Sequence, residues 1–251
     1  MKRLIAIALT SLLMASATGL AKEKLPPGVA KGTQIGVVTL LDPEVMHYHA
    51  AKQTRDSFLK IQAVNWNVDA MLNEALQAPA AAAGLALTPL APTDSLVRAR
   101  ESCFVNAPLI KGLPKNCSAS LVELANSAGV SYLIVMAPGL NNADHAGSAR
   151  LEGMSEMLRG WGFITRERSG AKDRPTLFCE VELLLINVTP EGASLRARQW
   201  GGVYNYQWQS YTVPADPKEF PPEQLEQLQP LFATILARHA KDLMDQVHVE
   251  P

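Results

Sequence analysis

The fold is decided by the stretch TLFCEVELLLINVTPEGASLRARQW, residues 176–200. Its first half, residues 176–188, is a run of mostly apolar side chains that is typical of a buried strand. The segment TPEG, residues 189–192, carries the proline and glycine of a turn and leads into ASLRARQW. Two strand segments joined by so short a turn predict an antiparallel hairpin.

Strand and helix patterns surround this hairpin. Apolar runs at 34–41 and 131–138 are typical of buried strands, and residues 45–51 and 57–66 predict a second hairpin with half-exposed strands. Capping residues Asn67, Thr93 and Ser118 and later stop signals predict helices over 68–83, 94–103, 119–128 and 222–247. A kink or break is expected at Pro79 and an interruption at Pro230. This order indicates an α/β fold, with α+β as the alternative. We expect a single mixed β-sheet covered by helices, with an antiparallel hairpin and a helix in its C-terminal part.

The first residues have the features of a secretory signal peptide. Lys2 and Arg3 precede an apolar run, and small residues follow it up to Ala21. The run is shorter than the roughly 20 residues that a membrane span needs. We therefore expect residues 1–21 to be a signal peptide and residues 22–251 to form a single globular domain. With no integral membrane span after cleavage, the protein is expected in the periplasm or outside the cell.

The charge of the chain argues against a nucleic-acid partner. The formal net charge is −1, and removal of Lys2 and Arg3 with the signal peptide changes it to −3. Proteins that bind nucleic acid or anionic lipid usually present a basic face. The sequence contains no run of basic residues that would form one, so we expect neither kind of partner.

The three cysteines suit an oxidising compartment, where thiols pair. Cys103 and Cys117 flank a segment with two prolines and a glycine, which is typical of a loop. We expect these two cysteines to form a disulfide, which would stabilise the fold by about 3 kcal/mol in the chain-entropy model. Cys179 lies in the apolar strand pattern and is expected to be a buried free thiol, because burial raises the pKa of a thiol.

Two histidines lie two residues apart in the expected strand 45–51. Side chains at this spacing point to the same face of a strand, so His47 and His49 would present both imidazoles together. This arrangement can hold zinc or copper, with Asp144 and His145 in a later polar loop as further ligands. The alternative is that the histidines are ordinary polar residues on a solvent-facing strand. No other cofactor is indicated by the sequence.

The segment WGGVYNYQWQSY, residues 200–211, is rich in aromatic residues. Tyr204, Tyr206 and Trp208 recur at every second position, so a strand here would have one aromatic face. An exposed face of this kind would stack on a glycan or pack on a protein partner. The alternative is that these rings cover one end of the hydrophobic core.

The order of elements resembles the α/β domain of the curli secretion-channel lipoprotein family and the amino-terminal domain of the Tol-system propeller protein. The residues that carry the resemblance are IGVVTLL at 35–41, AGVSYLIVMAPG at 128–139 and the hairpin at 176–200. The chain is also similar to uncharacterised secreted proteobacterial proteins with an LEG…GF stretch, here at 151–153 and 162–163. These resemblances imply a module of the cell envelope and supply no catalytic residues.

The sequence is consistent with three functions. The leading expectation is a non-enzymatic periplasmic or secreted module that binds an envelope protein or a glycan through the aromatic segment. The second is a metal-binding protein or metal-dependent enzyme that uses His47 and His49. The third is an assembly subunit that forms an oligomer by pairing an edge strand of the 45–65 hairpin.

Overall fold

The computed structural model describes residues 28–51, 53–105, 113–142, 157–166, 174–214, 216 and 218–250. The strands are β1 Val29–Ala30, β2 Gln34–Thr39, β3 Glu44–Ala50, β4 Phe58–Ala63, β5 Ala86–Pro89, β6 Tyr132–Pro138, β7 Leu140–Asn142, β8 Met157–Arg166, β9 Thr176–Thr189, β10 Gly192–Gln207 and β11 Val249–Glu250. The helices are α1 Val68–Ala82, α2 Asp94–Arg100, α3 Lys115–Ala128, α4 Pro222–Glu226 and α5 Gln229–Met244, with a 3₁₀ turn η1 Thr54–Asp56 and a π-helical turn η2 Glu101–Val105.

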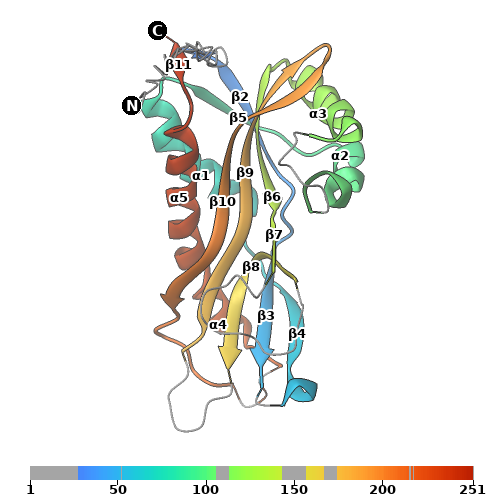
Figure 1. The fold of residues 1–251 in the computed structure, drawn as a ribbon. Helices are drawn as coiled ribbons and strands as arrows, with labels where there is room; N and C mark the ends of the chain where they lie inside the picture. Colours follow the sequence, from blue (N-terminus) through green and yellow to red (C-terminus); the bar gives the residue numbers. More distant parts are fainter. Residues whose placement is uncertain are drawn as a thin grey trace, which may run out of the picture.

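The hairpin β9–β10 is the longest element of the sheet. Along one side β9 pairs with β10, from Thr189 opposite Gly192 to Thr176 opposite Gln207. On its other side β9 pairs first with β8 and then, from Val181 onward, with β6. The sheet therefore divides into an upper part, with β6, β2 and β5, and a lower part, with β8, β3 and β4 (Figure 1).

The large sheet is mixed, as predicted, but it does not hold every strand, because β1 and β11 pair in a separate two-stranded parallel sheet. In the upper part β5, β2 and β6 run parallel to one another, whereas β6 runs antiparallel to β9. In the lower part β3 runs parallel to β8 and antiparallel to β4. The complete order is β4-β3-β8-β9-β6-β2-β5, with β10 beside β9 and β7 beside β8. This arrangement of strands and helices is an α/β fold.

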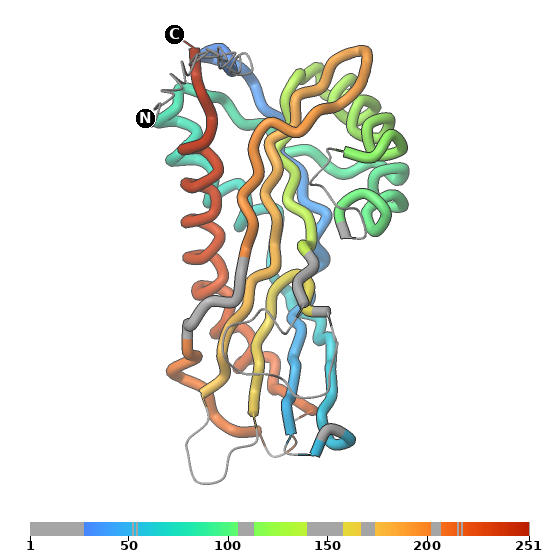
Figure 2. Tube along the Cα trace, in the orientation of Figure 1, coloured from blue at the N-terminus to red at the C-terminus, as the bar shows by residue number. Residues whose placement is uncertain are grey.

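Helices cover both faces of the upper part. Helices α1 and α5 lie against one face of the long hairpin, and α2 and α3 lie against the other face (Figures 1 and 2). Leu183 of β9 belongs to the core that contains Leu236 of α5, and the next residue, Leu184, belongs to the core that contains Leu121 of α3. Successive strand residues point to opposite faces, so the unbroken apolar run of β9 supplies both cores.

The starts of the helices agree with the sequence in two cases and differ in one. The side chains of Asn67 and Thr93 cap α1 and α2 by accepting bonds from the backbone N–H groups three residues later. The prediction that Ser118 caps the next helix is wrong, because α3 begins earlier, after Pro114. Ser118 Oγ instead accepts a bond from Ala193 N at 2.7 Å, which ties α3 to the start of β10.

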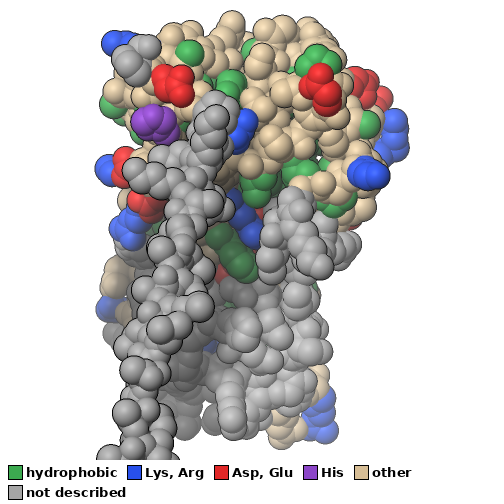
Figure 3. Space-filling view, turned by 45° about the horizontal axis from the view of Figure 1, so that its top comes forward, with side chains coloured by type: hydrophobic (Ala, Val, Ile, Leu, Met, Phe, Trp, Pro, Cys, Tyr) green, Lys and Arg blue, Asp and Glu red, His purple; other side chains and the backbone are tan. Residues whose placement is uncertain are grey.

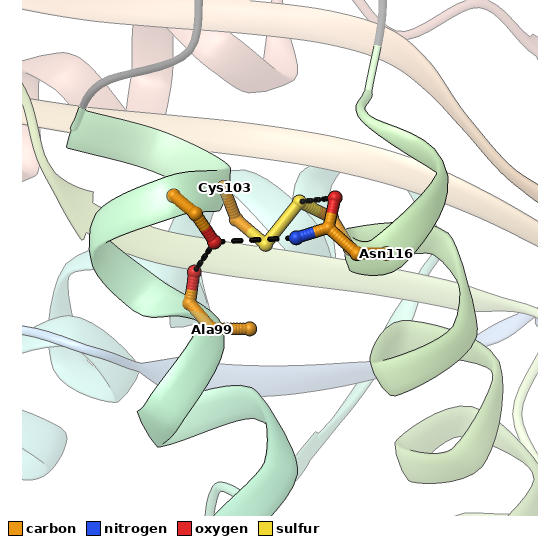
Figure 4. Close-up of a disulfide and its surroundings, with 5 residues drawn as sticks. Ala99, Cys103 and Asn116 are labelled. Atoms are coloured by element: carbon orange, nitrogen blue, oxygen red, sulfur yellow. Dashed lines mark hydrogen bonds between the residues drawn. A yellow bond between two sulfur atoms is a disulfide. The ribbon is translucent and has the colours of Figure 1, made fainter.

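The disulfide between Cys103 and Cys117 is confirmed (Figure 4). Their sulfur atoms are 2.11 Å apart, and the bond joins η2 to the first turn of α3. Beside it, Asn116 Nδ2 donates to Ser102 Oγ at 3.2 Å, and that hydroxyl donates to Ala99 O at 3.0 Å. Cys179 is a buried free cysteine, and burial raises the pKa of its thiol well above the ordinary value. Both cysteine predictions therefore hold.

Removal of the disulfide is expected to weaken the fold. The double variant Cys103→Ser/Cys117→Ser should lose about 3 kcal/mol of unfolding free energy, because the unfolded chain regains the freedom that the cross-link removes. Urea unfolding of the variant and of the oxidised protein measures this difference. The single variant Cys179→Ser serves as a control that keeps the disulfide. An unchanged midpoint in the double variant would contradict the prediction.

None of the helices in the described part of the chain combines the length and the apolar character that crossing a bilayer requires. On the face shown in Figure 3, Lys and Arg side chains are interspersed with Asp and Glu side chains.

Candidate functional site

The two predicted histidines lie on β3, in the middle of the lower part of the sheet. His47 is opposite Lys60 of β4 and Phe163 of β8, and His49 is opposite Phe58 and Thr165. Both imidazoles reach the same hydroxyl. His47 Nε2 and His49 Nδ1 are each 2.7 Å from Thr165 Oγ1. The expectation that the two histidines share a face is therefore confirmed.

The hydroxyl of Thr165 limits where the protons of this group can lie. A hydroxyl has one proton and two lone pairs, so it can donate to only one of the two imidazoles. At least one of the two bonded ring nitrogens of His47 and His49 therefore donates an N–H to Thr165 Oγ1. Thr165 was not predictable as a partner, because it is more than a hundred residues away along the chain.

The prediction of a solvent-facing pair of histidines is wrong for His47, which is fully buried. Its ring stacks on Phe163 at 4.5 Å between centroids and meets Phe58 and Phe220 edge-on at 5.1 Å and 4.9 Å. Phe220 comes from the segment before α4, which crosses over the lower part of the sheet. A covering segment supplied from so far along the chain explains why alternation within β3 alone did not predict burial.

Burial also determines the charge of His47. Removal of the ring from water, with smaller contributions from the charges of His49 and Lys60, lowers the pKa of His47 from 6.5 to about 3. His47 is therefore a neutral imidazole at neutral pH. Its Nδ1 atom is buried and has no hydrogen-bond partner among the described residues.

The low pKa of His47 predicts a loss of stability in acid. In the unfolded chain the ring protonates near its ordinary pKa of 6.5, whereas in the folded protein it stays neutral down to about pH 3. Its contribution is therefore complete above pH 6.5 and should fall by about 1.4 kcal/mol for each pH unit below that value, down to pH 3. Urea unfolding between pH 7.5 and pH 4 measures the slope.

The matched variant for this prediction is His47→Phe, which keeps an aromatic ring at the same place. Its stability should fall less steeply with pH than that of the natural protein. Some slope should remain, because burial also lowers the pKa of His239 in α5. Equal slopes in the two proteins would show that His47 does not govern the acid sensitivity.

The metal prediction involves residues inside and outside the described chain. Within the described residues, no group of three or more His, Cys, Asp and Glu side chains could hold a metal ion. Asp144 and His145 lie outside the described residues. A zinc or copper site at His47 and His49 therefore stays a prediction, which metal analysis of the purified protein and of His47→Ala/His49→Ala would test.

The expected aromatic face is corrected at Trp208. Strand β10 ends at Gln207, and the pairing of β9 with β10 is irregular between Val203 and Gln207, so the two-residue alternation does not continue to Trp208. Trp208 is fully buried and contacts Phe163, Tyr211 and Phe220. Its assignment to an exposed ligand-binding face is therefore wrong. The side chains of Tyr204 and Tyr206 lie outside what the structure describes.

The outer edge of β4 combines an open side of the strand with exposed apolar side chains. Strand β4 is the last strand of the lower part, and among the described residues no strand pairs with its outer side. Leu59 and Ile61 are 37% and 47% exposed, while Phe58, Lys60 and Gln62 point to the opposite face and are half-buried. Edge strands of native proteins are usually protected by charges, prolines or bulges. The three exposed side chains of β4 are Leu59, Ile61 and Ala63, and two of them are large and apolar.

Two cavities lie beside this edge, and Ile61 borders both. The first measures about 40 Å³ and lies where the upper and lower parts of the sheet meet, between the end of α2, β3 and β8; its lining includes Asp42, Met46, Arg100, Arg159 and Trp161. The second measures about 310 Å³ and lies between β4 and α4; its lining includes Lys60, Gln62, Phe220, Leu225 and Glu226.

The two arginines that line the first cavity are paired with carboxylates. Arg100 donates to Asp42 Oδ2 at 2.7 Å and to Leu40 O at 3.1 Å. Arg159 donates to both carboxylate oxygens of Glu101 at 3.0 Å and 3.2 Å. The arginines are thus neutralised by carboxylates, so the cavity does not present a net positive charge to a ligand.

Comparisons with known proteins leave the function open. No family model and no curated protein matches the chain. Among solved structures, a hypothetical protein from Chlamydia trachomatis is similar at 15% identity over 84% of this chain and 98% of that chain, with a TM-score of 0.30. The resemblance to the curli and Tol-system domains stays a prediction.

Proposed function

We propose that this protein is a non-enzymatic binding module of the cell envelope, periplasmic or secreted, that holds a protein partner at the outer edge of β4. The observation that carries the proposal is the exposure of Leu59 and Ile61 on an edge with no paired strand. Exposed edges with apolar side chains are sites where another chain adds by main-chain pairing. The signal-like residues 1–21 and the disulfide support the location.

A protein partner is supported better than a glycan. The case for a glycan was the aromatic face at 204–208, and Trp208, one of its three rings, lies in the core. Leu59 and Ile61 are aliphatic side chains, which suit an apolar protein surface and provide no ring on which a sugar could stack.

Site-specific photo-cross-linking in the cells that make the protein tests the proposal. A benzophenone amino acid at Leu59 should give a covalent adduct with another protein. The same group at Val213, which is 78% exposed and apolar but belongs to no strand, is the matched control. The adduct at position 59 should disappear when Ile61→Lys is added. The absence of an adduct at 59, or equal adducts at 59 and 213, would refute the proposed function.

A further inference from the structure

We infer that the partner binds as an extended peptide that pairs with the outer edge of β4 and places successive side chains into the two cavities that Ile61 borders. This inference rests on the proposed function and specifies the form and chemistry of the partner. It depends on three observations: the direction of the backbone groups of β4, the position of the cavities, and one buried amide without an acceptor.

Alternate backbone N–H and C=O groups of β4 point outward, where a further strand could pair with them. Val64 N donates to Pro43 O at 2.9 Å, and these residues continue the antiparallel register of β3 and β4. In such a ladder only every second pair of opposite residues is hydrogen-bonded. The N–H and C=O groups of Leu59, Ile61 and Ala63 therefore point away from β3. A peptide that lies along this edge can form backbone hydrogen bonds with these three alternate residues.

The cavities lie where an added strand would direct its side chains. Successive residues of a strand point to opposite faces of the sheet. The first cavity lies on the face that carries Met46 and Ile61, and the second lies on the face that carries Gln62 and Phe220. A peptide residue beside Ile61 would therefore place its side chain on one side, and the next residue would use the other. Main-chain pairing with alternate side chains in pockets is the usual mode of strand addition.

The two cavities favour different peptide side chains. The first, at about 40 Å³, suits a small side chain such as that of Ala or Ser. The second, at about 310 Å³, has apolar walls from Phe220 and Leu225. Gln62 borders it, and its Nε2 atom is closed to solvent and has no acceptor among the described residues. A buried N–H without an acceptor is costly, so free energy is recovered when the Gln62 side chain turns to donate to a ligand oxygen in the cavity.

The two charged groups of the second cavity do not compete for that oxygen. Lys60 Nζ already donates to Lys218 O and Glu219 Oε1, each at 2.7 Å. Glu226 Oε2 accepts a bond from Trp66 Nε1 at 3.1 Å. The favoured peptide residue therefore has an apolar stem and a neutral oxygen, as in Gln, Asn or Thr, and is preceded or followed by a small residue.

The probe for this inference is a phage-displayed library of random linear dodecapeptides, selected on the purified protein. Selected peptides should contain a small residue next to Gln, Asn or Thr. A synthetic peptide of the winning sequence is then N-methylated at one position at a time. Strand addition predicts that methylation weakens binding at every second position, about tenfold or more, because only alternate peptide N–H groups face β4. Loss at every position, or at none, would overturn the inference.

Variants of the protein test the same contacts from the other side. Ile61→Pro removes an N–H that faces the peptide and leaves the ladder to β3 intact, and Ile61→Ala controls for the lost side chain. Gln62→Leu removes the buried donor. Ile61→Pro and Gln62→Leu should each weaken the peptide about tenfold or more relative to their controls, Ile61→Ala and Val213→Ala. Near-ultraviolet circular dichroism establishes that each variant is folded. If Ile61→Pro does not fold, the N-methyl series on the natural protein still decides.

The outcomes separate this inference from the proposed function. A cross-linked partner at Leu59 combined with no selected peptide, or with a peptide that binds Ile61→Pro and Gln62→Leu as tightly as the natural protein, overturns the inference and leaves the proposed function standing. No adduct at Leu59 refutes the proposed function itself. A dimer of this chain that is seen by mass photometry and lost in Ile61→Lys would identify a second copy as the occupant, and would also overturn the inference.

Discussion

Gly162→Ala is expected to lower the unfolding free energy by about 3 kcal/mol, near the upper end of the usual cost of overpacking. A Cβ atom at Gly162 would lie 1.9 Å from the carbonyl oxygen of Met46 and 2.5 Å from Cζ of Phe178. Met46 is the partner of Gly162 across β3 and β8. The added methyl group must therefore push two paired strands apart, and backbone cannot give way as the end of a flexible side chain can. Urea unfolding measures the loss.

The matched control is Gly32→Ala. Gly32 has a φ of 83°, so alanine there is strained, but no atom lies within 4 Å of the added Cβ. This variant should lose only about 1–2 kcal/mol, the cost of the left-handed backbone. If Gly162→Ala were no more destabilised than Gly32→Ala, the close approach of β3 and β8 would not be as the structure has it.

Trp208→Ala is expected to cost about 3–5 kcal/mol, the range for truncation of a buried tryptophan or phenylalanine. The indole is fully buried, and its ring lies 5.3 Å from Phe163 and 6.2 Å from Phe220, the two rings that also enclose His47. Its removal leaves a cavity in the centre of this aromatic group. A shift of the urea midpoint, followed by the fluorescence of the remaining tryptophans, measures the effect.

Trp200 provides the comparison within the same stretch of sequence. It is 46% exposed, and its ring lies 4.9 Å from the guanidinium carbon of Arg198. Trp200→Ala should therefore cost about 1 kcal/mol or less, the value of an exposed cation–π contact. Similar losses of unfolding free energy in Trp200→Ala and Trp208→Ala would indicate that Trp208 lies on the surface.

The fold was predictable from sequence wherever local pattern was strong. The apolar runs at 34–41, 131–138 and 176–188 are the central strands β2, β6 and β9, and the turn at 189–192 joins β9 to β10. The division of the sheet was not predictable. It depends on β9 exchanging its partner between Glu180 and Val181, and no local pattern records which strand lies beside another.

The candidate site was predictable only in part. The spacing of His47 and His49 placed both rings on one face, but their shared partner Thr165 and their cover Phe220 come from distant segments. The aromatic face at 204–208 failed because the alternation of side chains holds only while strand pairing stays regular. The open edge of β4 is a property of the whole sheet, so alternation in residues 58–63 could suggest exposed positions but not the missing neighbour.

The exchange of partners along β9 has a consequence for how the molecule unfolds. Strand β9 has a neighbour on both sides for most of its length, so release of β8, β6 or β10 alone leaves it still held on the other side. Its amide protons should be the last to exchange with solvent, because they are freed only by global opening. Strand β9 is therefore shared by the upper and lower parts of the sheet. A destabilising substitution in β4 should also lower the stability of β5, and the protein should unfold in one cooperative step.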